Sequence, residues 1–255
     1  MKKLTALLMA LCAICAFAQE KQDAEKKIEI PADKEILQIK LPRPLFSGTP
    51  RELRTPNLEP TRKAGEKRPP IIVPKGLKNL AFKKEVTSSD SEPVIGELEC
   101  ITDGNKDGVE GSYVELSPGK QWVQIDLGKK SKIYAVCVWH FHSQARVYRD
   151  IVIQTADDPD FIMNVKTIFN NDHDNSSGLG VGKDRDYIET FEGRPIPVNG
   201  VEGQYIRFYS NGNTSDDMNH YIEIEVFGKS PSPPLRGTSP RGGGKDSSMM
   251  KLSKK

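Results

Sequence analysis

Five strand-like runs lie between residues 121 and 227, and they constrain the fold more than any other feature of the chain. The runs are 121–127, 133–141, 149–155, 204–209 and 221–227. The run 133–141 is almost continuously apolar, which is typical of a strand buried on both faces, and the others alternate in character. Clusters of Gly, Asn, Asp and Pro mark loops at 102–111, 157–160, 170–184, 193–203 and 210–219. Since no long amphipathic helix is present, the pattern predicts an all-β fold, an antiparallel β-sandwich of the jelly-roll type.

Aromatic residues and acidic charge both concentrate in residues 76–228. This stretch holds 16 of the 18 aromatic residues, and its 15 basic and 25 acidic residues give a formal net charge of −10. A domain of 153 residues is large enough to bury a substantial core. Its negative charge argues against nucleic acid as a partner and is compatible with cation binding. We therefore take 76–228 as the folded domain.

The first 18 residues have the composition of a signal peptide. Lys2 and Lys3 precede an uncharged apolar stretch, which ends at the small-x-small pattern of residues 16–18. We expect cleavage before Gln19, export to the periplasm, the cell surface or the medium, and no transmembrane span in the mature chain. The alternative is an uncleaved membrane anchor.

The two flanks of the domain differ from it in composition. Residues 19–75 hold 9 of the 18 prolines and carry 13 basic and 9 acidic residues. We interpret them as a charged linker that drapes over the domain, with one short strand within 28–41 as a weaker expectation. Residues 229–255 hold seven basic residues and one acidic residue, and they are predicted to be a disordered tail rich in Pro and Gly.

Two cysteines, Cys100 and Cys137, remain after removal of the signal peptide. In an oxidising compartment they are able to form one disulfide bridge. The alternative is a pair of free thiols buried in strands, and the sequence leaves both open.

Four segments, in order, make the domain similar to a known family. They are NLAFKKEVTSSD (79–90), ITDGNKDG (101–108), WVQIDLGKKSKIYAVCVWH (122–140) and YIEIEVFG (221–228). The domain resembles discoidin-type domains, including the C-type domains of coagulation factors and the bacterial carbohydrate-binding modules of galactose-binding-like fold. The resemblance implies a β-sandwich that recognises carbohydrate through loops at one end. The chain departs from the family at 170–187, and it lacks the terminal disulfide of the coagulation-factor domains.

A calcium site is expected near residue 103. Asp103, Asn105 and Asp107 alternate in a Gly-containing loop, and calcium prefers six to eight oxygen ligands. An EF-hand is excluded because its twelfth position would be Val114 rather than Glu. The resemblance implies a structural calcium ion completed by Glu223 and main-chain oxygens. The alternative is an Asp/Asn/Gly turn without an ion.

Three polar loops are the candidates for ligand binding. Sugars need planar hydrogen-bonding groups for their hydroxyls and an apolar or aromatic surface for their C–H faces, and these loops offer both. The residues that we expect to contact ligand are His140, His142, Arg146, Tyr148, Arg149, Asp172, His173, Asn175, Asn211 and Asn213. The alternative is that these are ordinary loops whose Asn and Asp side chains satisfy their own backbone.

Catalysis is the weaker interpretation. His140, His142 and His173, with Asp172 or Asp174, contain the atoms of a zinc site that would activate water, but their spacing has little specificity. We expect a binding protein and no enzyme, with a glycan or cell-surface polysaccharide as the partner. The alternative is an adhesion or assembly protein that binds another protein through the same loops.

Overall fold

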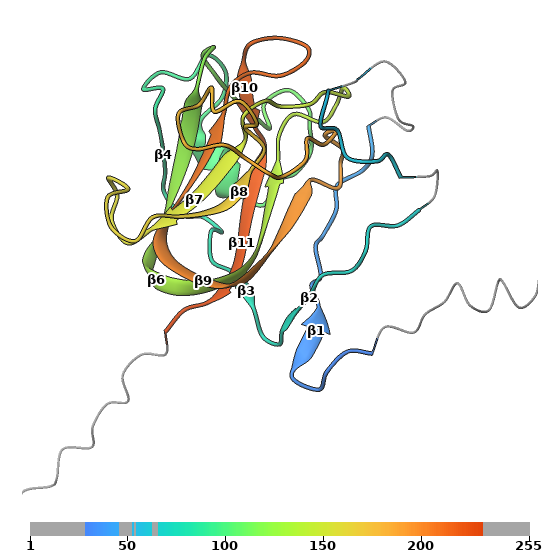
Figure 1. The fold of residues 1–255 in the computed structure, drawn as a ribbon, viewed down its shortest axis with the longest axis vertical. Helices are drawn as coiled ribbons and strands as arrows, with labels where there is room; N and C mark the ends of the chain where they lie inside the picture. Colours follow the sequence, from blue (N-terminus) through green and yellow to red (C-terminus); the bar gives the residue numbers. More distant parts are fainter. Residues whose placement is uncertain (1–28, 46–52, 54, 63–65, 232–255) are drawn as a thin grey trace, which may run out of the picture.

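The structure is a computed structural model that describes residues 29–45, 53, 55–62 and 66–231 (Figure 1). The predicted signal peptide and almost all of the predicted tail lie outside these residues. No helix among the described residues has the length and apolar character needed to cross a membrane.

The described residues form an all-β structure with one short 3-10 helix, which confirms the predicted fold class. The elements are β1 (Lys34–Ile36), β2 (Ile72–Pro74), β3 (Lys78–Asn79), β4 (Val86–Ser88), η1 (Leu98–Thr102), β5 (Val114–Leu116), β6 (Gln121–Trp139), β7 (Val152–Ala156), β8 (Lys166–Asn170), β9 (Arg194–Ser210), β10 (Asn219–Tyr221) and β11 (Glu223–Lys229). Two short pairs, β1 with β2 and β5 with β10, accompany the main sheet.

Two long bent strands, β6 and β9, build the sandwich (Figure 1). Their antiparallel pairing is interrupted between Asp126 and Ser131, and Gly128 takes a positive φ of 81° there. The first half of β6 pairs with β4 and with the second half of β9, and that half of β9 also pairs with β7, which pairs with β8. After the bend β6 pairs with β11, which pairs with β3. All of these pairings are antiparallel, so β6 and β9 belong to both layers, and bulges allow them to turn from one layer to the other.

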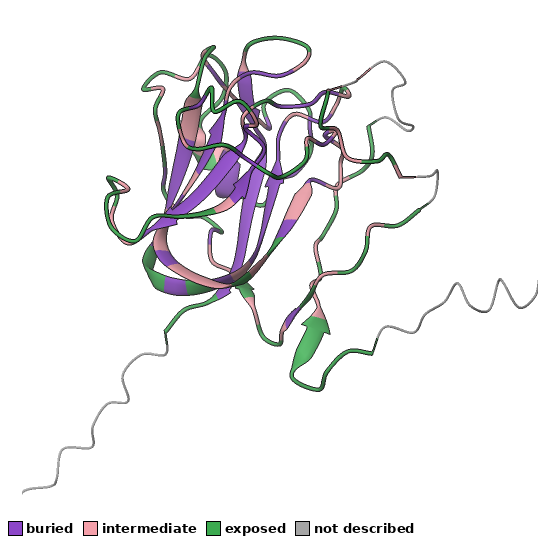
Figure 2. Ribbon diagram, in the orientation of Figure 1, coloured by how far each residue is buried: buried purple, intermediate pink, exposed green. Residues whose placement is uncertain are grey.

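The second half of β6 is buried on both faces, as its apolar run predicted. Val136 and Val138 belong to the main core between the layers, and Cys137 and Trp139 belong to a second cluster on the outer face. Figure 2 shows the central strands of the sandwich, β6 among them, as mostly buried. Successive side chains along a strand point to opposite faces, so one continuous apolar run supplies both clusters.

The outer cluster is covered by residues that precede the domain. Val73 is a buried member of it, and Leu37, Ile39 and Ile71 pack against it from the same segment. We call the described residues of 29–75 the strap, which lies along one flank of the sandwich (Figure 1). The strand weakly expected within 28–41 is β1, and it pairs with β2. The strap therefore packs on the domain and contributes to its buried surface.

The disulfide considered from the sequence is absent, because both cysteines are free in the structure. Cys137 is buried in the outer cluster, whereas Cys100 packs against the main core. Their side chains belong to different hydrophobic clusters, which explains why no bridge forms. Both thiols are free, but only Cys137 is buried in a strand as the alternative stated, because Cys100 is half-buried in η1.

Candidate functional site

The three polar loops meet at one end of the sandwich. β6 begins and ends there, β7 begins there, and β8 and β9 end there, as their antiparallel pairing requires. A cavity of about 720 Å³ lies among these loops, and we call it the loop pocket. Its lining residues are Thr55, Pro56, Asn57, Pro118, Gly119, Val147, Tyr148, Arg149, Asp150, Asn171, His173, Asp174, Ser176, Asp186, Asn211 and Asp217.

Four of the predicted contact residues line the loop pocket. They are Tyr148, Arg149, His173 and Asn211. The side chain of Arg149 is 52% exposed, and its guanidinium lies 3.6 Å from a carboxylate oxygen of the more exposed Asp217. This pair is therefore open to competition from a ligand.

Several pocket residues were not predicted from the sequence. The strap contributes Asn57, which we had assigned to a linker, and the loops contribute Asp150 and Asp186. Asp150 has a positive φ of 52°, a conformation that Asp tolerates better than most residues. The sequence offered one signal for Asp150: it follows Arg149, a predicted contact residue, directly before a strand.

Three aspartates gather beside the loop pocket. One carboxylate oxygen from each of Asp150, Asp172 and Asp174 lies within 4.8 Å of the others. Asp172 is buried and accepts hydrogen bonds from the backbone N–H groups of Ser176 and Ser177, at 3.0 and 2.9 Å. Hydrogen bonds from Ser176 hold the pKa of Asp174 below its ordinary value. Asp172 therefore holds the backbone of its own loop and, contrary to our expectation, is not exposed for contact with a ligand.

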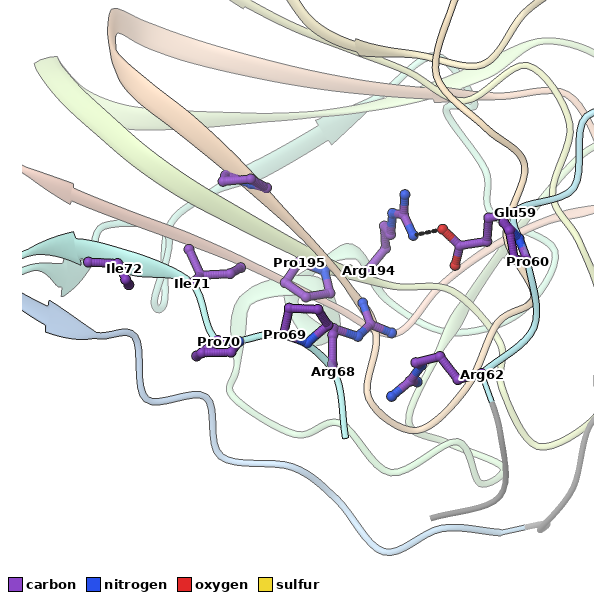
Figure 3. Close-up of a pocket in the computed structure, with 11 residues that line it drawn as sticks. Glu59, Pro60, Arg62, Arg68, Pro69, Pro70, Ile71, Ile72, Arg194 and Pro195 are labelled. Carbon is purple, nitrogen blue, oxygen red and sulfur yellow. Dashed lines mark hydrogen bonds and ion pairs between the residues drawn. The ribbon is translucent and has the colours of Figure 1, made fainter. Parts of the chain in front are cut away.

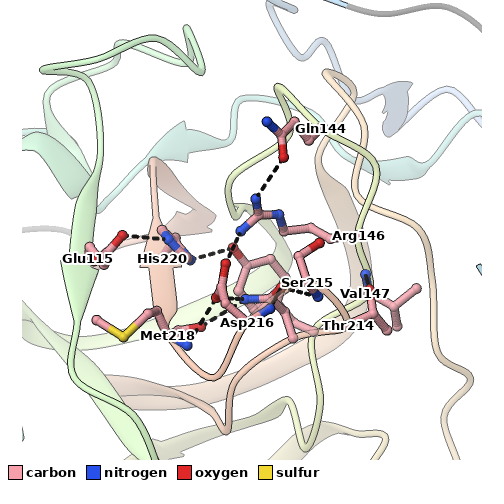
Figure 4. A network of polar contacts seen from close by, with 11 residues as sticks. Glu115, Gln144, Arg146, Val147, Thr214, Ser215, Asp216, Met218 and His220 are labelled. Atoms are coloured by element: carbon pink, nitrogen blue, oxygen red, sulfur yellow. Dashed lines mark hydrogen bonds and ion pairs between the residues drawn. The ribbon is translucent and has the colours of Figure 1, made fainter.

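Arg146 and His220 are buried and belong to a polar network under the loops (Figure 4). The Arg146 Nη1 atom donates to Asp216 at 3.2 Å, and its guanidinium carbon lies 4.6 Å from the ring centre of Phe141. The Tyr148 hydroxyl donates to His220 Nδ1 at 2.9 Å. Arg146 is 5% exposed, so our expectation that it contacts ligand is corrected. It supports the loop instead.

The far ring nitrogen of His220 completes this network. His220 Nε2 lies 2.9 Å from a carboxylate oxygen of Glu115, to which it donates as the neutral tautomer. Burial, reinforced by the nearby positive charge of Arg146, lowers the pKa of His220 to about 4. His220 is therefore neutral near pH 7 and links the Tyr148 loop to β5.

His140 and His142 are both buried and face different partners. His140 Nδ1 lies 2.7 Å from Glu189 Oε1, and its ring stacks on Tyr148 with 4.5 Å between centres. His142 Nε2 donates to the backbone oxygen of Lys106 at 2.9 Å. Neither contacts the loop pocket, so both expectations are corrected. Among the described residues, the close group of metal-ligating atoms contains no histidine, so the structure does not bring His140, His142 and His173 together as the zinc hypothesis requires.

Asn175 and Asn213 shape turns, as the alternative interpretation stated. Asn213 is fully buried and donates to Asp216 at 2.6 Å and to the Met218 carbonyl at 3.0 Å. Asn175 has a positive φ of 60°, and its side-chain oxygen accepts the Gly180 N–H at 2.6 Å. Both amides are used by their own loops.

The expected calcium residues lie in one loop and on the strand beside it. The side chains of Asp103 and Asn105 accept backbone N–H groups two residues ahead, at 2.7 and 3.0 Å, as in Asx turns. Glu223 is fully buried, and its Oε2 accepts the Gly104 N–H at 3.0 Å. Its other oxygen, Oε1, is buried without a partner in the described structure. The three carboxylates do not form a group within 4.8 Å, so any ion here needs backbone oxygens as well.

The sandwich is similar to carbohydrate-binding modules of solved structure, a similarity that the sequence also indicated. The CBM32 module of AlyQ in complex with 4,5-unsaturated mannuronic acid is 20% identical, with a TM-score of 0.41 over 57% of this chain and 96% of that chain. Chitosan-binding module 1 of a Paenibacillus sp. IK-5 chitosanase/glucanase is 20% identical, with a TM-score of 0.39 over 58% and 98%. A Streptococcus pneumoniae fucose-binding module, SpX-3, is 18% identical, with a TM-score of 0.42 over 59% and 97%.

No protein-family model and no curated protein matches the chain.

Proposed function

We propose that this protein is an exported carbohydrate-binding protein that holds a glycan in the loop pocket, without catalysing its hydrolysis. The observation that carries the proposal is the pocket itself, at the end of the sandwich where three loops converge. Arg149, His173 and Asn211 supply planar polar groups to it, and Pro56 and Pro118 supply apolar surface. This combination suits the hydroxyls and C–H faces of a sugar.

The charge of the loop pocket selects among sugars. Four aspartates line it, Asp150, Asp174, Asp186 and Asp217, against one arginine. Their carboxylates accept hydrogen bonds from hydroxyl groups and repel other anions. The glycan is therefore neutral or carries an amino group, and sugars with carboxylate or sulfate groups bind poorly here.

A glycan array read with the full chain tests the proposal. Neutral and amino sugars should bind, and the free monosaccharide should compete. Asn211→Ala and Arg149→Ala should each lower affinity about tenfold, since each removes hydrogen bonds to the ligand. Arg185→Ala is the matched control, because Arg185 is exposed and does not line the pocket. Equal affinity in all three variants would contradict the assignment.

A structural calcium ion at the 103–107 loop belongs to the same proposal. The unpartnered buried oxygen of Glu223 supports it, because a buried carboxylate oxygen is costly to leave without a hydrogen bond or a cation. Asp103, Asn105 and Asp107 would complete the site with backbone oxygens. Bound there, the ion would fix the loop to β11.

A protein partner is the second candidate, and one surface favours it. The carboxylate of Asp158 accepts the N–H groups of Ile162 and Met163, at 3.2 and 2.6 Å, and so fixes the loop that follows β7. Ile162 is 78% exposed on this loop. Binding of a protein that is lost in Ile162→Asp and retained in Asn211→Ala would favour adhesion through this loop.

A further inference from the structure

A second cavity, of about 580 Å³, lies between the strap and the beginning of β9 (Figure 3). Two stretches of the strap, 59–62 and 68–72, form one side, and β9 forms the other with Arg194, Pro195 and Pro197. The cavity shares no lining residue with the loop pocket. We call it the arginine pocket, because Arg62, Arg68 and Arg194 all line it.

Positive charge exceeds negative charge in the arginine pocket. Arg194 Nη1 donates to Glu59 Oε2 at 2.6 Å. The single carboxylate of Glu192 pairs with both Arg62 and Arg68, with Oε2 lying 3.3 Å from Arg68 Nη2. Three guanidinium groups line the cavity, and Glu59 is the one carboxylate among its described lining residues. The ion pairs with Glu59 and Glu192 tether the strap to the domain.

The donors of these arginines are also in excess. A guanidinium has five N–H donors, and Arg68 contributes only its ion pair with Glu192 to the contacts of the described residues. The Nε atoms of Arg68 and Arg194 are buried without a hydrogen-bond partner in the described structure. Burial lowers the pKa of Arg68, which agrees with a guanidinium removed from water. The side chains of Arg68 and Arg194 are nevertheless 25% and 19% exposed, so an oxyanion in the cavity would accept from their terminal N–H groups and not from the buried Nε atoms.

The walls of the pocket are apolar and stiff. Pro60, Pro69, Pro70 and Pro195 face it together with Ile71. Proline fixes its own φ angle, so much of the shape is set before a ligand arrives. A cavity of this size is in the range of small-molecule sites. Its occupant must therefore combine one negative group with a compact body.

We propose that the arginine pocket is a second binding site, for the carboxylate of a uronic acid residue. The carboxylate pairs with Arg68 and its neighbouring guanidinium groups, and the sugar ring lies against the prolines. Because Arg accepts a carboxylate in a planar, two-pronged geometry, it selects this group over a neutral hydroxymethyl. This site is separate from the loop pocket, and the choice of a sugar as the body that bears the carboxylate rests on the carbohydrate-binding function proposed above.

Calorimetric titration of the full chain with sodium glucuronate, and with glucose as its neutral match, tests the proposal. We expect glucuronate to bind, glucose to give no signal, and the affinity to fall as salt concentration rises. Arg68→Gln should weaken glucuronate about tenfold or more, as expected for loss of a charge-assisted pair. Arg149→Gln, in the loop pocket, should leave glucuronate affinity unchanged.

The controls separate binding from folding and from a general anion site. Arg68→Lys keeps the charge that pairs with Glu192 but loses the planar fork, so it should fold normally and still bind glucuronate several-fold more weakly. Thermal unfolding of each variant checks its fold. The proposal is overturned if glucose binds equally well, if Arg68→Lys binds like the wild type, or if Arg149→Gln alone removes binding. Sulfate binding as tightly as glucuronate would also overturn it, as a site without selectivity for a carboxylate.

Discussion

The two pockets differ in origin and in charge. The loop pocket is built mainly by loops of the acidic domain, and four aspartates line it. The arginine pocket forms where the basic strap meets β9, and three arginines line it. The uneven distribution of charge along the chain therefore reappears as two sites of opposite sign. The ligands that we propose follow this difference, with neutral or amino sugars in the loop pocket and a uronic acid in the arginine pocket.

The largest expected effect tests whether the strap is integral to the fold. Trp139 is fully buried in the outer cluster, and its indole N–H donates to the Phe191 carbonyl at 3.0 Å. Trp139→Ala should lower the free energy of unfolding by about 3–5 kcal/mol, since it leaves a cavity under the strap. Urea denaturation measures this. A loss below about 1 kcal/mol would mean that the strap detaches readily and that the arginine pocket is not a stable feature.

Glu223→Gln tests the calcium proposal at the end of the sandwich where the loop pocket lies. Burial raises the pKa of Glu223 to about 8. A raised pKa in the folded state gives stability that is present below about pH 4.5 and lost as the pH rises through about 8. Without calcium, the wild type should therefore lose up to about 1.4 kcal/mol per pH unit from this group within that window, and Glu223→Gln should not.

Calcium should restore the stability that the wild type loses as the pH rises toward 8. A bound cation stabilises the ionised carboxylate, so calcium should raise the melting temperature of the wild type at pH 8. Glu223→Gln should not respond to the ion. Thermal unfolding at pH 8 with calcium and with a chelator gives the answer, and equal midpoints for the wild type in both would remove the calcium assignment.

The sequence was sufficient for the all-β class because the strand pattern is local, but the predicted loop at 193–203 was wrong, since Arg194–Ser210 is one long strand, and the strand Lys166–Asn170 was not predicted. The apolar run at 133–141 predicted burial on both faces, and the structure places Val138 in the main core and Trp139 in the outer cluster. The pattern could not show what covers the outer face. That partner is the strap, whose Val73 lies more than sixty residues away in the chain. Its proline content suggested an extended linker that drapes over the domain, but not which face of the sandwich it covers.

The sequence was less informative about the site, because residue type does not determine which way a side chain points. Arg149 and Arg146 are three positions apart in one loop, yet Arg149 is exposed in the pocket and Arg146 is buried against Phe141. His140 was chosen as a polar loop residue, but a buried partner, Glu189, holds it inside. Pairings across 49 residues such as this one depend on the tertiary structure.

His220 should make the loop end sensitive to acid. Its pKa of about 4 lies below the ordinary value of 6.5, so its contribution to stability is present above pH 6.5 and is lost as the pH falls toward 4. His220→Gln should reduce the loss of stability over this window, by up to about 1.4 kcal/mol per pH unit. His173→Gln, at the pocket surface, is the control and should follow the wild type. Unfolding curves between pH 7 and 4 that coincide for all three proteins would contradict this role.

Arg149→Ala should have the smallest effect on stability, and that separates the ligand surface from its support. The side chain is half exposed, and its ion pair with Asp217 joins two solvated groups. Such pairs contribute about 0–1 kcal/mol, so the free energy of unfolding should change by less than about 0.5 kcal/mol. Glycan affinity should nevertheless fall, because the guanidinium is free to turn toward a ligand. Arg146→Ala should behave in the opposite way, losing stability first, since that side chain is buried between Asp216 and Phe141. If the two variants lost affinity and stability in equal proportion, the loop pocket would be a folding feature and not a binding surface.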